Sequence, residues 1–432
     1  MSLPKPLFSV VSLGCARTLV DTEKMVDQLQ QGGFQLTAEG SGERITILNT
    51  CSFIQAAIDE TETNIRQLSE RKLAGHIKYL VVAGCYPSRF KEPDLQAKFP
   101  DVDLWITTKD EMQVQQKLSA LVFEKKFRPA SPSVPYTKLT PSHFAYLKIS
   151  EGCNNWCSFC TIPKIRGEHT SKTSEAVIKE ANLQLSFGAK ELIVIAEDTT
   201  AWGEDIYGKP SFPTLLKELA KVDVPWIRAM YIFPSRVDAE LIAVLRDEPK
   251  LCRYMDMPIQ HVNSMLLEKM NRKHDKAFLT SILDQLFNEI PDFTWRTTFI
   301  VGFPGETEEH VQELMDFMTQ YPITQLGCFP YSEERETRSA RMADKVDPAI
   351  IQKRIRRIMK HQYELVTKRH QALIGKTFDM IYEGNGEGRT YREAPDVDGR
   401  ILVSDSESLV SGNFYPVKIT AVKGYDLIAQ LV

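Results

Sequence analysis

Short apolar runs alternate with longer amphipathic stretches along the first 123 residues. The apolar runs have the length of buried strands and lie at 8–14, 45–50, 77–84 and 102–107. The stretches between them have the apolar spacing of helices and cover 17–31, 54–73, 86–98 and 109–123. This alternation is typical of a parallel sheet covered by helices, so we expect an N-terminal α/β domain.

A second α/β region follows a proline-rich segment. Residues 128–142 hold four prolines and show no helical period, which predicts an interdomain linker. Six further strand candidates are separated by helical stretches and lie at 145–150, 191–197, 226–232, 254–258, 295–302 and 323–329. Six such units predict a partial (β/α)6 barrel, with functional loops at the carboxyl ends of its strands. A long helix is expected at 348–373.

The pattern changes again near the C-terminus. Short alternating runs separated by glycines lie at 377–384, 388–394, 399–404 and 415–432, and they predict a small antiparallel β-barrel. The predicted fold class is therefore α/β with a small all-β domain at the end. The expected domains are 1–127, 143–373 and 374–432, and the linker at 128–142 joins the first two.

Composition narrows the class of protein. Hydrophobic residues make up 43% and charged residues 25% of the 432 residues, as in soluble globular proteins. No apolar run approaches the roughly 18 residues of a membrane-spanning helix. The first residues lack the pattern of a secretory signal, so we expect a cytoplasmic protein without membrane contact. The net charge of −4 excludes a globally basic nucleic-acid binder.

Three of the eight cysteines form a triplet directly after the first strand of the second region. Cys153, Cys157 and Cys160 can hold three corners of a [4Fe–4S] cubane and leave the fourth iron without a protein ligand. An incomplete zinc knuckle is the alternative, but structural zinc sites close with four ligands. No fourth cysteine or histidine lies nearby at a typical spacing, so we favour the cluster.

Three more cysteines end three predicted strands of the first domain. Cys15, Cys51 and Cys85 should emerge at one carboxyl edge if that sheet is parallel, although they lie far apart in sequence. Three converging thiolates predict a second cluster with one open iron. The remaining two, Cys252 and Cys328, lie in or beside strands and are interpreted as core residues.

The triplet resembles the signature of the radical S-adenosylmethionine (SAM) superfamily, and the two trios together resemble its methylthiotransferases. The resemblance covers essentially the whole chain and implies an N-terminal cluster domain, a radical SAM barrel and a C-terminal barrel of the TRAM type. It implies two [4Fe–4S] clusters and SAM as cofactors. Positions matching its cofactor-binding motifs are Phe159, Glu191, Gly302 and Gly305.

Three polar residues at predicted strand ends are further candidates for contacts with cofactor or substrate. They are Asp198, Gln260 and His261. Polar residues at such positions also serve as caps and loop hydrogen-bonders, so both interpretations stay open.

Several stretches resemble the branch that modifies a ribosomal protein, known as the RimO type. They include SLGCARTLVDTE, LKISEGCNNWCSFC, MPIQH and YREAPDVDG. The resemblance implies methylthiolation of the β-carbon of an aspartate in small-subunit ribosomal protein S-twelve. The chain departs from the branch in two places. Ala16, Arg17 and Thr18 stand where it usually has Pro-Lys-Asn, and Glu197 stands where it often has glutamine.

Charge also favours a basic protein as the partner. Residues 375–432 hold six Lys or Arg and nine Asp or Glu, so the last domain carries three net negative charges. RNA-binding domains need positive charge to replace phosphate counterions. The long helix keeps RNA contact open through its basic cluster, Lys353, Arg354, Arg356, Arg357 and Lys360. Methylthiolation of adenosine in tRNA, and a non-catalytic iron–sulfur sensor or RNA-binding protein, remain the alternatives. The sequence does not indicate the electron donor.

Overall fold

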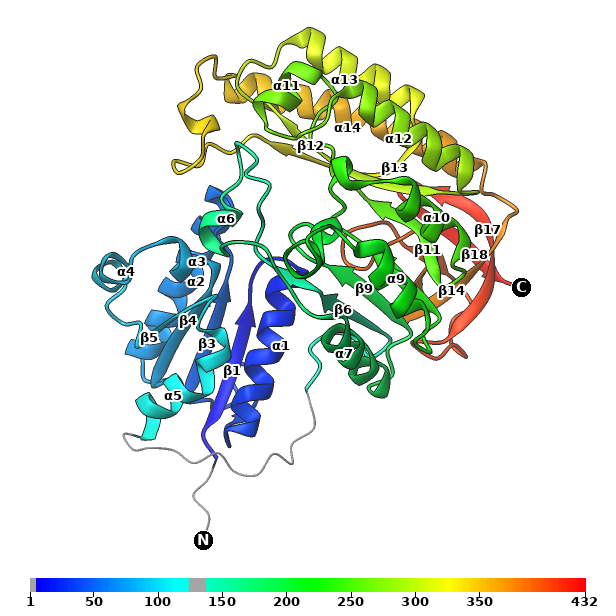
Figure 1. Ribbon diagram of the computed structural model, residues 1–432. Helices are drawn as coiled ribbons and strands as arrows, with labels where there is room; N and C mark the ends of the chain where they lie inside the picture. Colours follow the sequence, from blue (N-terminus) through cyan, green and yellow to red (C-terminus); the bar gives the residue numbers. More distant parts are fainter. Residues whose placement is uncertain (1–4, 124–136) are drawn as a thin grey trace. The chain divides into compact units, whose positions relative to one another are not determined.

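The computed structural model describes residues 5–123 and 137–432 (Figure 1). The chain divides into two compact units, one of Met1–Thr140 with Cys160–Glu168 and one of Pro141–Phe159 with His169–Val432. Most of the predicted linker at 128–142 lies outside the described residues. No helix in the described part of the chain is long and apolar enough to cross a membrane.

The first unit contains a five-stranded sheet in the order β2-β1-β3-β4-β5. All its neighbouring strands are parallel, as the sequence pattern predicted. The short edge strand β2 was not predicted, because two residues show no period. The strands are β1 (Leu7–Ser12), β2 (Gln35–Leu36), β3 (Ile45–Thr50), β4 (Tyr79–Gly84) and β5 (Leu104–Thr107).

Helices cover both faces of this sheet. Phe8, Ile47 and Val81 pack with α1 and α5 on one face, and Leu48 and Val82 pack with α2 and α4 on the other. This two-sided cover explains why β3 is buried along its whole length. The helices are α1 (Ala16–Gln31), α2 (Gln55–Leu73), α3 (Cys85–Arg89), α4 (Glu92–Lys98), η1 (Glu111–Gln113) and α5 (Val114–Phe123).

The single helix predicted at 86–98 is divided in two. Phe90 has extended backbone angles, φ −116° and ψ 157°, and ends α3. Pro93 then stands in the first turn of α4. Proline lacks the amide that a helix interior needs but fits the first turn, so it marks a new start.

The second unit contains a six-stranded sheet in the order β13-β12-β11-β10-β9-β6. All five neighbouring pairs are parallel, which confirms the predicted partial barrel. Its strands are β6 (Phe144–Lys148), β9 (Glu191–Ile195), β10 (Trp226–Ala229), β11 (Leu251–Asp256), β12 (Thr294–Val301) and β13 (Ile323–Pro330). A small antiparallel pair, β7 (Ser150–Glu151) with β8 (Thr170–Ser171), lies beyond β6.

The helices between these strands complete the core of the second unit. Leu216, Leu245 and Leu283 are fully or almost fully buried in it. The longer helices are α7 (Ser174–Ser186), α9 (Phe212–Ala220), α10 (Ala239–Asp247), α12 (Lys276–Glu289), α13 (Glu308–Gln320) and α14 (Pro348–Gln371). The shorter ones are α8 (Glu204–Tyr207), α11 (Ser264–Lys269), η2 (Thr199–Ala201), η3 (Pro234–Arg236) and η4 (Ser339–Arg341), while α6 (Ile162–Ile165) belongs to the first unit.

The C-terminal strands close into a barrel in the order β14-β15-β16-β18-β17. The prediction of an antiparallel barrel is wrong at one pair, because β16 and β18 run parallel. Closure brings these two strands side by side without a hairpin between them, so local pattern could not indicate their direction. The strands are β14 (Thr377–Gly384), β15 (Glu387–Arg389), β16 (Ile401–Val403), β17 (Phe414–Lys423) and β18 (Asp426–Leu431).

Buried charges join this barrel to the starts of the sheet strands. Glu191 forms ion pairs with Arg228 (2.6 Å) and with Arg389 (2.8 Å), and all three side chains are buried. Asp398, which follows β15, accepts hydrogen bonds from Tyr254 (2.8 Å) and Arg296 (3.2 Å). The barrel and the sheet therefore belong to one compact unit.

Candidate metal and cofactor site

The first cysteine trio lies at the carboxyl ends of three adjacent strands. Cys15 follows β1 and caps α1, Cys51 follows β3, and Cys85 follows β4 as the first residue of α3. A Cβ placed on Gly14 would lie 2.9 Å from the Cβ of Cys51, so the segments approach closely. Gly14 also has a φ of +101°, which favours glycine. Parallel strand order thus gathers thiols that are distant in sequence.

The three thiols of this trio differ in acidity. Burial raises the pKa of Cys15, but Arg17, hydrogen bonds from Thr18 and the charge of Arg166 outweigh it and bring the pKa to about 7. Burial, and then the nearby Cys15 sulfur, raise the pKa of Cys51. Burial also raises the pKa of Cys85 to about 12. A cation that stabilises a thiolate equally prepares it to bind a metal.

Sequence reasoning missed Arg166 as a member of this site. Its buried guanidinium donates to the sulfur of Cys85 (3.4 Å) and pairs with Asp21 (3.0 Å). It stands at the C-terminal end of α6, in the segment 160–168 that belongs to the first unit. The contact links distant parts of the chain, so no spacing in the sequence indicates it.

The second trio lies in the loop between β7 and α6. Burial, with Asp198 and Cys157 nearby, raises the pKa of Cys153 to about 12. Cys153 and Cys157 belong to the second unit, and Cys160 begins the segment assigned to the first. All eight cysteines of the chain are free thiols.

The donor set suits iron–sulfur clusters. In the described residues, no three His, Cys, Asp or Glu side chains are grouped to hold a single metal ion. A cubane spreads its thiolates over separate irons, so the fit depends on groups of free cysteines rather than on a closed shell around a single ion. The two trios supply six free thiols of the kind that such clusters need. Their assignment as ligands remains a prediction.

Asp198 supports the cysteine loop. Its carboxylate is buried and accepts hydrogen bonds from Asn155 (2.6 Å), Arg236 (2.6 Å), Thr200 (2.6 Å) and the amide of Ala201 (3.2 Å). A carboxylate offers about four acceptor sites, so these four donors fill it. In this structure Asp198 has a supporting role, and a contact of Asp198 with cofactor or substrate stays a prediction. Its role is to hold Asn155, which lies inside the triplet.

Glu191 lies at the opposite edge of the sheet from the cysteine loop, and its predicted contact with a cofactor stays a prediction. Glu191 is the first residue of β9 and lies opposite Phe144, the first residue of β6. It thus lies at the amino edge of the sheet, whereas the cysteine loop follows the carboxyl edge. Its carboxylate is fully buried and ion-paired with two arginines, which makes it structural.

The strand-end glycines serve a tight turn. Gly302 and Gly305 have φ values of +85° and +87°. A Cβ on Gly302 would lie 2.3 Å from the side chain of Ile351 in α14, so this glycine is required by packing. Phe159 packs against the small cluster that includes Met270 and Phe303. Contacts of these residues with a cofactor stay predictions.

Two candidates after β11 retain unpaired polar atoms. Among the described residues, the buried Oε1 of Gln260 and Nε2 of His261 have no hydrogen-bond partner. Burial lowers the pKa of His261 to about 3, and its Nδ1 accepts hydrogen bonds from the next two amides, so the neutral ring carries its proton on Nε2. That nitrogen lies 3.9 Å from Glu306, whose pKa burial raises to about 7. These groups keep capacity for a ligand.

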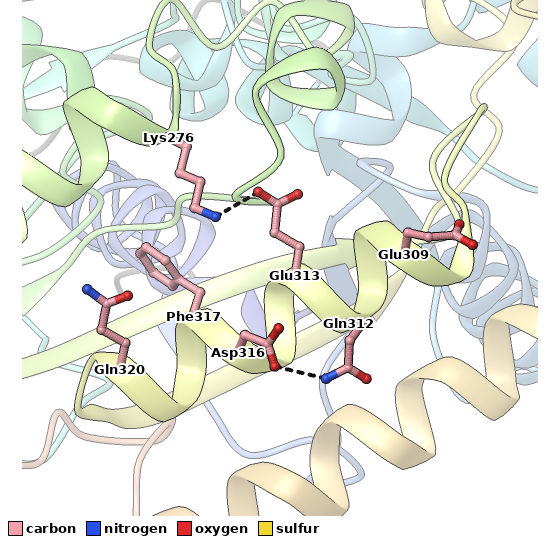
Figure 2. Close-up of a pocket in the computed structure, with 7 residues that line it drawn as sticks. All are labelled: Lys276, Glu309, Gln312, Glu313, Asp316, Phe317 and Gln320. Atoms are coloured by element: carbon pink, nitrogen blue, oxygen red, sulfur yellow. Dashed lines mark hydrogen bonds and ion pairs between the residues drawn. The ribbon is translucent and has the colours of Figure 1, made fainter.

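A surface pocket of about 340 Å³ lies elsewhere, along α13 (Figure 2). Lys276 of α12 pairs there with Glu313 (2.8 Å), and Gln312 donates to Asp316 (2.9 Å). None of its lining residues belongs to the loops that carry the cysteines or to the ends of the strands that precede those loops. The pocket is therefore separate from the candidate site.

Three family models match the chain, in the order of its structural parts. They are an uncharacterized protein family, UPF0004, over residues 8–107, the radical SAM superfamily over 147–318 and the TRAM domain over 374–432. The ribosomal protein uS12 methylthiotransferase RimO of Geobacter sulfurreducens is 38% identical over 452 aligned positions that cover 100% of both chains. Its counterpart of Alkaliphilus oremlandii is 37% identical and covers 98% of both.

This chain belongs to the RimO family of radical SAM methylthiotransferases. Members of this family are enzymes that use SAM and two [4Fe–4S] clusters. The three matched domains and the three folded parts correspond in order, which confirms the fold class expected from the sequence.

Solved structures agree on the fold. The radical SAM methyltransferase TsrM of Kitasatospora setae, with cobalamin and a [4Fe–4S] cluster bound, has a TM-score of 0.57 at 12% identity, covering 94% of this chain and 84% of that one. The cobalamin-dependent radical enzyme OxsB has a TM-score of 0.51 at 12% identity, covering 84% and 58%. At this identity the likeness shows the fold alone.

Proposed function

We propose that this enzyme methylthiolates the β-carbon of an aspartate in ribosomal protein uS12. In the proposal, Cys15, Cys51 and Cys85 hold one [4Fe–4S] cluster. The triplet Cys153, Cys157 and Cys160 holds the second, beside bound SAM. The observation that carries the assignment of the first cluster is the gathering of three free thiols at one edge of a parallel sheet.

The chemistry explains the need for these groups. A side-chain carbon–hydrogen bond of this kind is too weakly acidic for an ordinary general base. When bound, SAM and its cluster supply the radical that removes such a hydrogen. In the proposal, the chain's own residues bind these groups and orient them. Six thiolates serve as ligands, Arg17 and Arg166 offset the negative charge at the first trio, and Asp198 holds the loop of the second.

Charge supports a basic protein as the substrate. The C-terminal domain carries three net negative charges, which attract a cationic partner. The basic cluster of α14 offers RNA less charge than its sequence suggested, because Arg354 and Arg357 both pair with Glu308. Lys353, Arg356 and Lys360 remain exposed, so RNA near the substrate can still contact this helix. Such a substrate implies a cytoplasmic location.

Iron and sulfide analysis tests the two-cluster assignment. We compare anaerobically purified wild type with a Cys153→Ala, Cys157→Ala, Cys160→Ala triple variant, which should lose about half of its iron if two similar sites are separate. Cys328→Ala is the matched control and should keep all of its iron, because Cys328 lies in β13 outside both trios. Full loss or full retention of iron in the triple variant contradicts two independent sites.

Product analysis tests the substrate. Reconstituted enzyme receives SAM, a reductant, sulfide and either the ribosomal protein or tRNA, and both are analysed by mass spectrometry. A methylthio mass increase on the protein supports the proposal, and an increase only on tRNA shows that the specificity is wrong. Absence of any SAM cleavage by cluster-loaded enzyme would identify a non-catalytic protein.

A further inference from the structure

Three consecutive residues after α11 contact the cysteine loop of the second unit. The carbonyl of Met270 accepts a hydrogen bond from the amide of Ser158 (3.0 Å). The side chain of Asn271 donates to the carbonyls of Asn155 (3.1 Å) and Trp156 (2.9 Å). Met270 and Asn271 therefore hold the cysteine loop by hydrogen bonds to the backbone of that loop, independently of any bound group.

Arg272 differs from its neighbours because it reaches a sulfur. Its Nη1 donates a hydrogen bond to the Sγ of Cys157 over 3.3 Å. Its Nη2 donates to the carbonyl of Pro258 (2.7 Å), and its guanidinium lies 4.2 Å from the ring centre of Phe233. The side chain is 5% exposed, so water does little to screen its charge. The guanidinium is thus fixed in place with one N–H directed at the sulfur.

The first unit contains a similar arrangement. Arg166 is also buried and donates to the sulfur of Cys85. Hydrogen bonds to ligand sulfurs and nearby positive charge favour the reduced, more negative form of an iron–sulfur cluster, and they raise its reduction potential. Arginine suits this purpose because its charge is permanent and its donors are held in a rigid fork.

We propose that Arg272 is a positioning residue that raises the reduction potential of the cluster held by Cys157, so that it accepts an electron more readily. This rests on the proposed function, which supplies the cluster. The contact to the sulfur carries the effect, whereas Met270 and Asn271 hold only the backbone of the loop.

The chain offers a matched control. Arg236 also holds the cysteine loop, since its Nη1 donates to the side chain of Asn155 (2.8 Å) and to Asp198 (2.6 Å). Its hydrogen bonds in the described residues go to oxygen atoms rather than to sulfur. Arg236→Gln therefore disturbs the support of the loop and removes a positive charge that pairs with Asp198 rather than with a cysteine sulfur.

The experiment uses the full-length chain with Cys15, Cys51 and Cys85 replaced by alanine, so that a single cluster is observed. Wild-type Arg272, Arg272→Lys, Arg272→Gln and Arg236→Gln forms are reconstituted, assayed for iron and sulfide, and titrated electrochemically with electron paramagnetic resonance detection. At a fixed applied potential, the reduced-to-oxidised ratio should fall about tenfold in Arg272→Gln, equivalent to about 59 mV for one electron. Arg272→Lys should fall between, and Arg236→Gln should shift the potential less than Arg272→Gln does.

Each outcome has one meaning. An unchanged potential in Arg272→Gln with normal iron overturns the inference. Equal shifts in Arg272→Gln and Arg236→Gln also overturn it, because loop support would then explain both. Loss of all iron in both Arg272 variants also overturns the inference, since Arg272 would then serve only to maintain the structure of the loop. If the parent form itself binds no cluster, the proposed function fails instead.

Discussion

The side chain of Asn155 donates a hydrogen bond to the carboxylate of Asp198 over 2.6 Å, and both groups are buried. Asn155 lies between two cysteines of the triplet, and Asp198 follows the neighbouring strand β9. The pair therefore ties the shape of the cysteine loop to the sheet beneath it. Any change at Asp198 should therefore alter the shape of the cysteine loop.

Asp198→Ala should destabilise the protein and lower its iron content. The change leaves Asn155 and the partly exposed Arg236 without their shared partner, and breaking a largely buried charge pair costs up to about 3–5 kcal/mol. Urea unfolding and iron analysis measure the two effects. Glu204→Ala is the control, because this 47% exposed residue pairs with the same Arg236. Its loss should cost at most about 1 kcal/mol. Equal effects of the two variants would contradict this role.

Arg389→Met should loosen the C-terminal barrel from the sheet. Arg389 is buried and pairs with Glu191 (2.8 Å) and Glu383 (2.7 Å), so its removal leaves buried carboxylate charge under-compensated at a cost of about 3–5 kcal/mol. Denaturant unfolding and limited proteolysis at 374–432 detect the change. Arg400→Met removes an exposed pair with Glu387 and should cost no more than about 1 kcal/mol. A neutral Arg389→Met variant would show that hydrophobic contacts alone hold the barrel.

Gly84→Ala should be among the most destabilising single-methyl changes near the first trio. Gly84 has a φ of +96°, and a Cβ there would lie 2.2 Å from Asn49 Oδ1 and 2.9 Å from the carbonyl of Thr50. Strain and overpacking together predict a cost of at least about 3 kcal/mol.

Gly75→Ala separates these two contributions. Gly75 has a similar φ of +79°, but no atom of the described residues lies within 4 Å of the position that a Cβ would occupy there. Backbone strain alone should cost about 1–2 kcal/mol at this residue. Thermal unfolding compares the variants, and similar costs would show that the contact with Asn49 relaxes freely.

Cys15 should be the most reactive thiol of the first trio in iron-free protein. Its pKa of about 7 means that the thiolate, which is the nucleophile, forms as the pH rises through 7, so alkylation should accelerate over that interval. Cys85, with a pKa of about 12, should stay unreactive below about pH 9. Iodoacetamide labelling followed by peptide mass spectrometry measures both rates.

Arg17→Ala tests the cause of this acidity. Burial raises the pKa of Cys15 and Arg17 is the largest opposing influence, so its removal should move the midpoint of labelling to higher pH. Lys24→Ala, which changes a basic residue further along α1, should leave the midpoint in place. A midpoint unchanged in Arg17→Ala would assign the acidity to Thr18 and Arg166 instead.

The order of strands and helices follows from local pattern. Strands such as β3 and β9 are buried along their whole length because both of their faces are covered, and that requirement is visible in their largely apolar residues. The strand-end positions of Cys15, Cys51 and Cys85 could be predicted for the same reason. Once the sheet is parallel, its carboxyl ends share one edge, so the gathering of the trio followed from sequence and topology together.

Other features depend on contacts that no spacing encodes. Glu191 matched a cofactor motif, but the register opposite Phe144 puts it at the amino edge with Arg228 and Arg389. Arg166 and Arg272 each reach a cysteine sulfur from a distant segment. The sequence by itself determined which helices and strands form and which strand ends carry a cysteine, because apolar periodicity and chain direction act locally. Only the tertiary structure decided which charges meet those thiols, because buried ionic groups must find partners wherever packing brings them together.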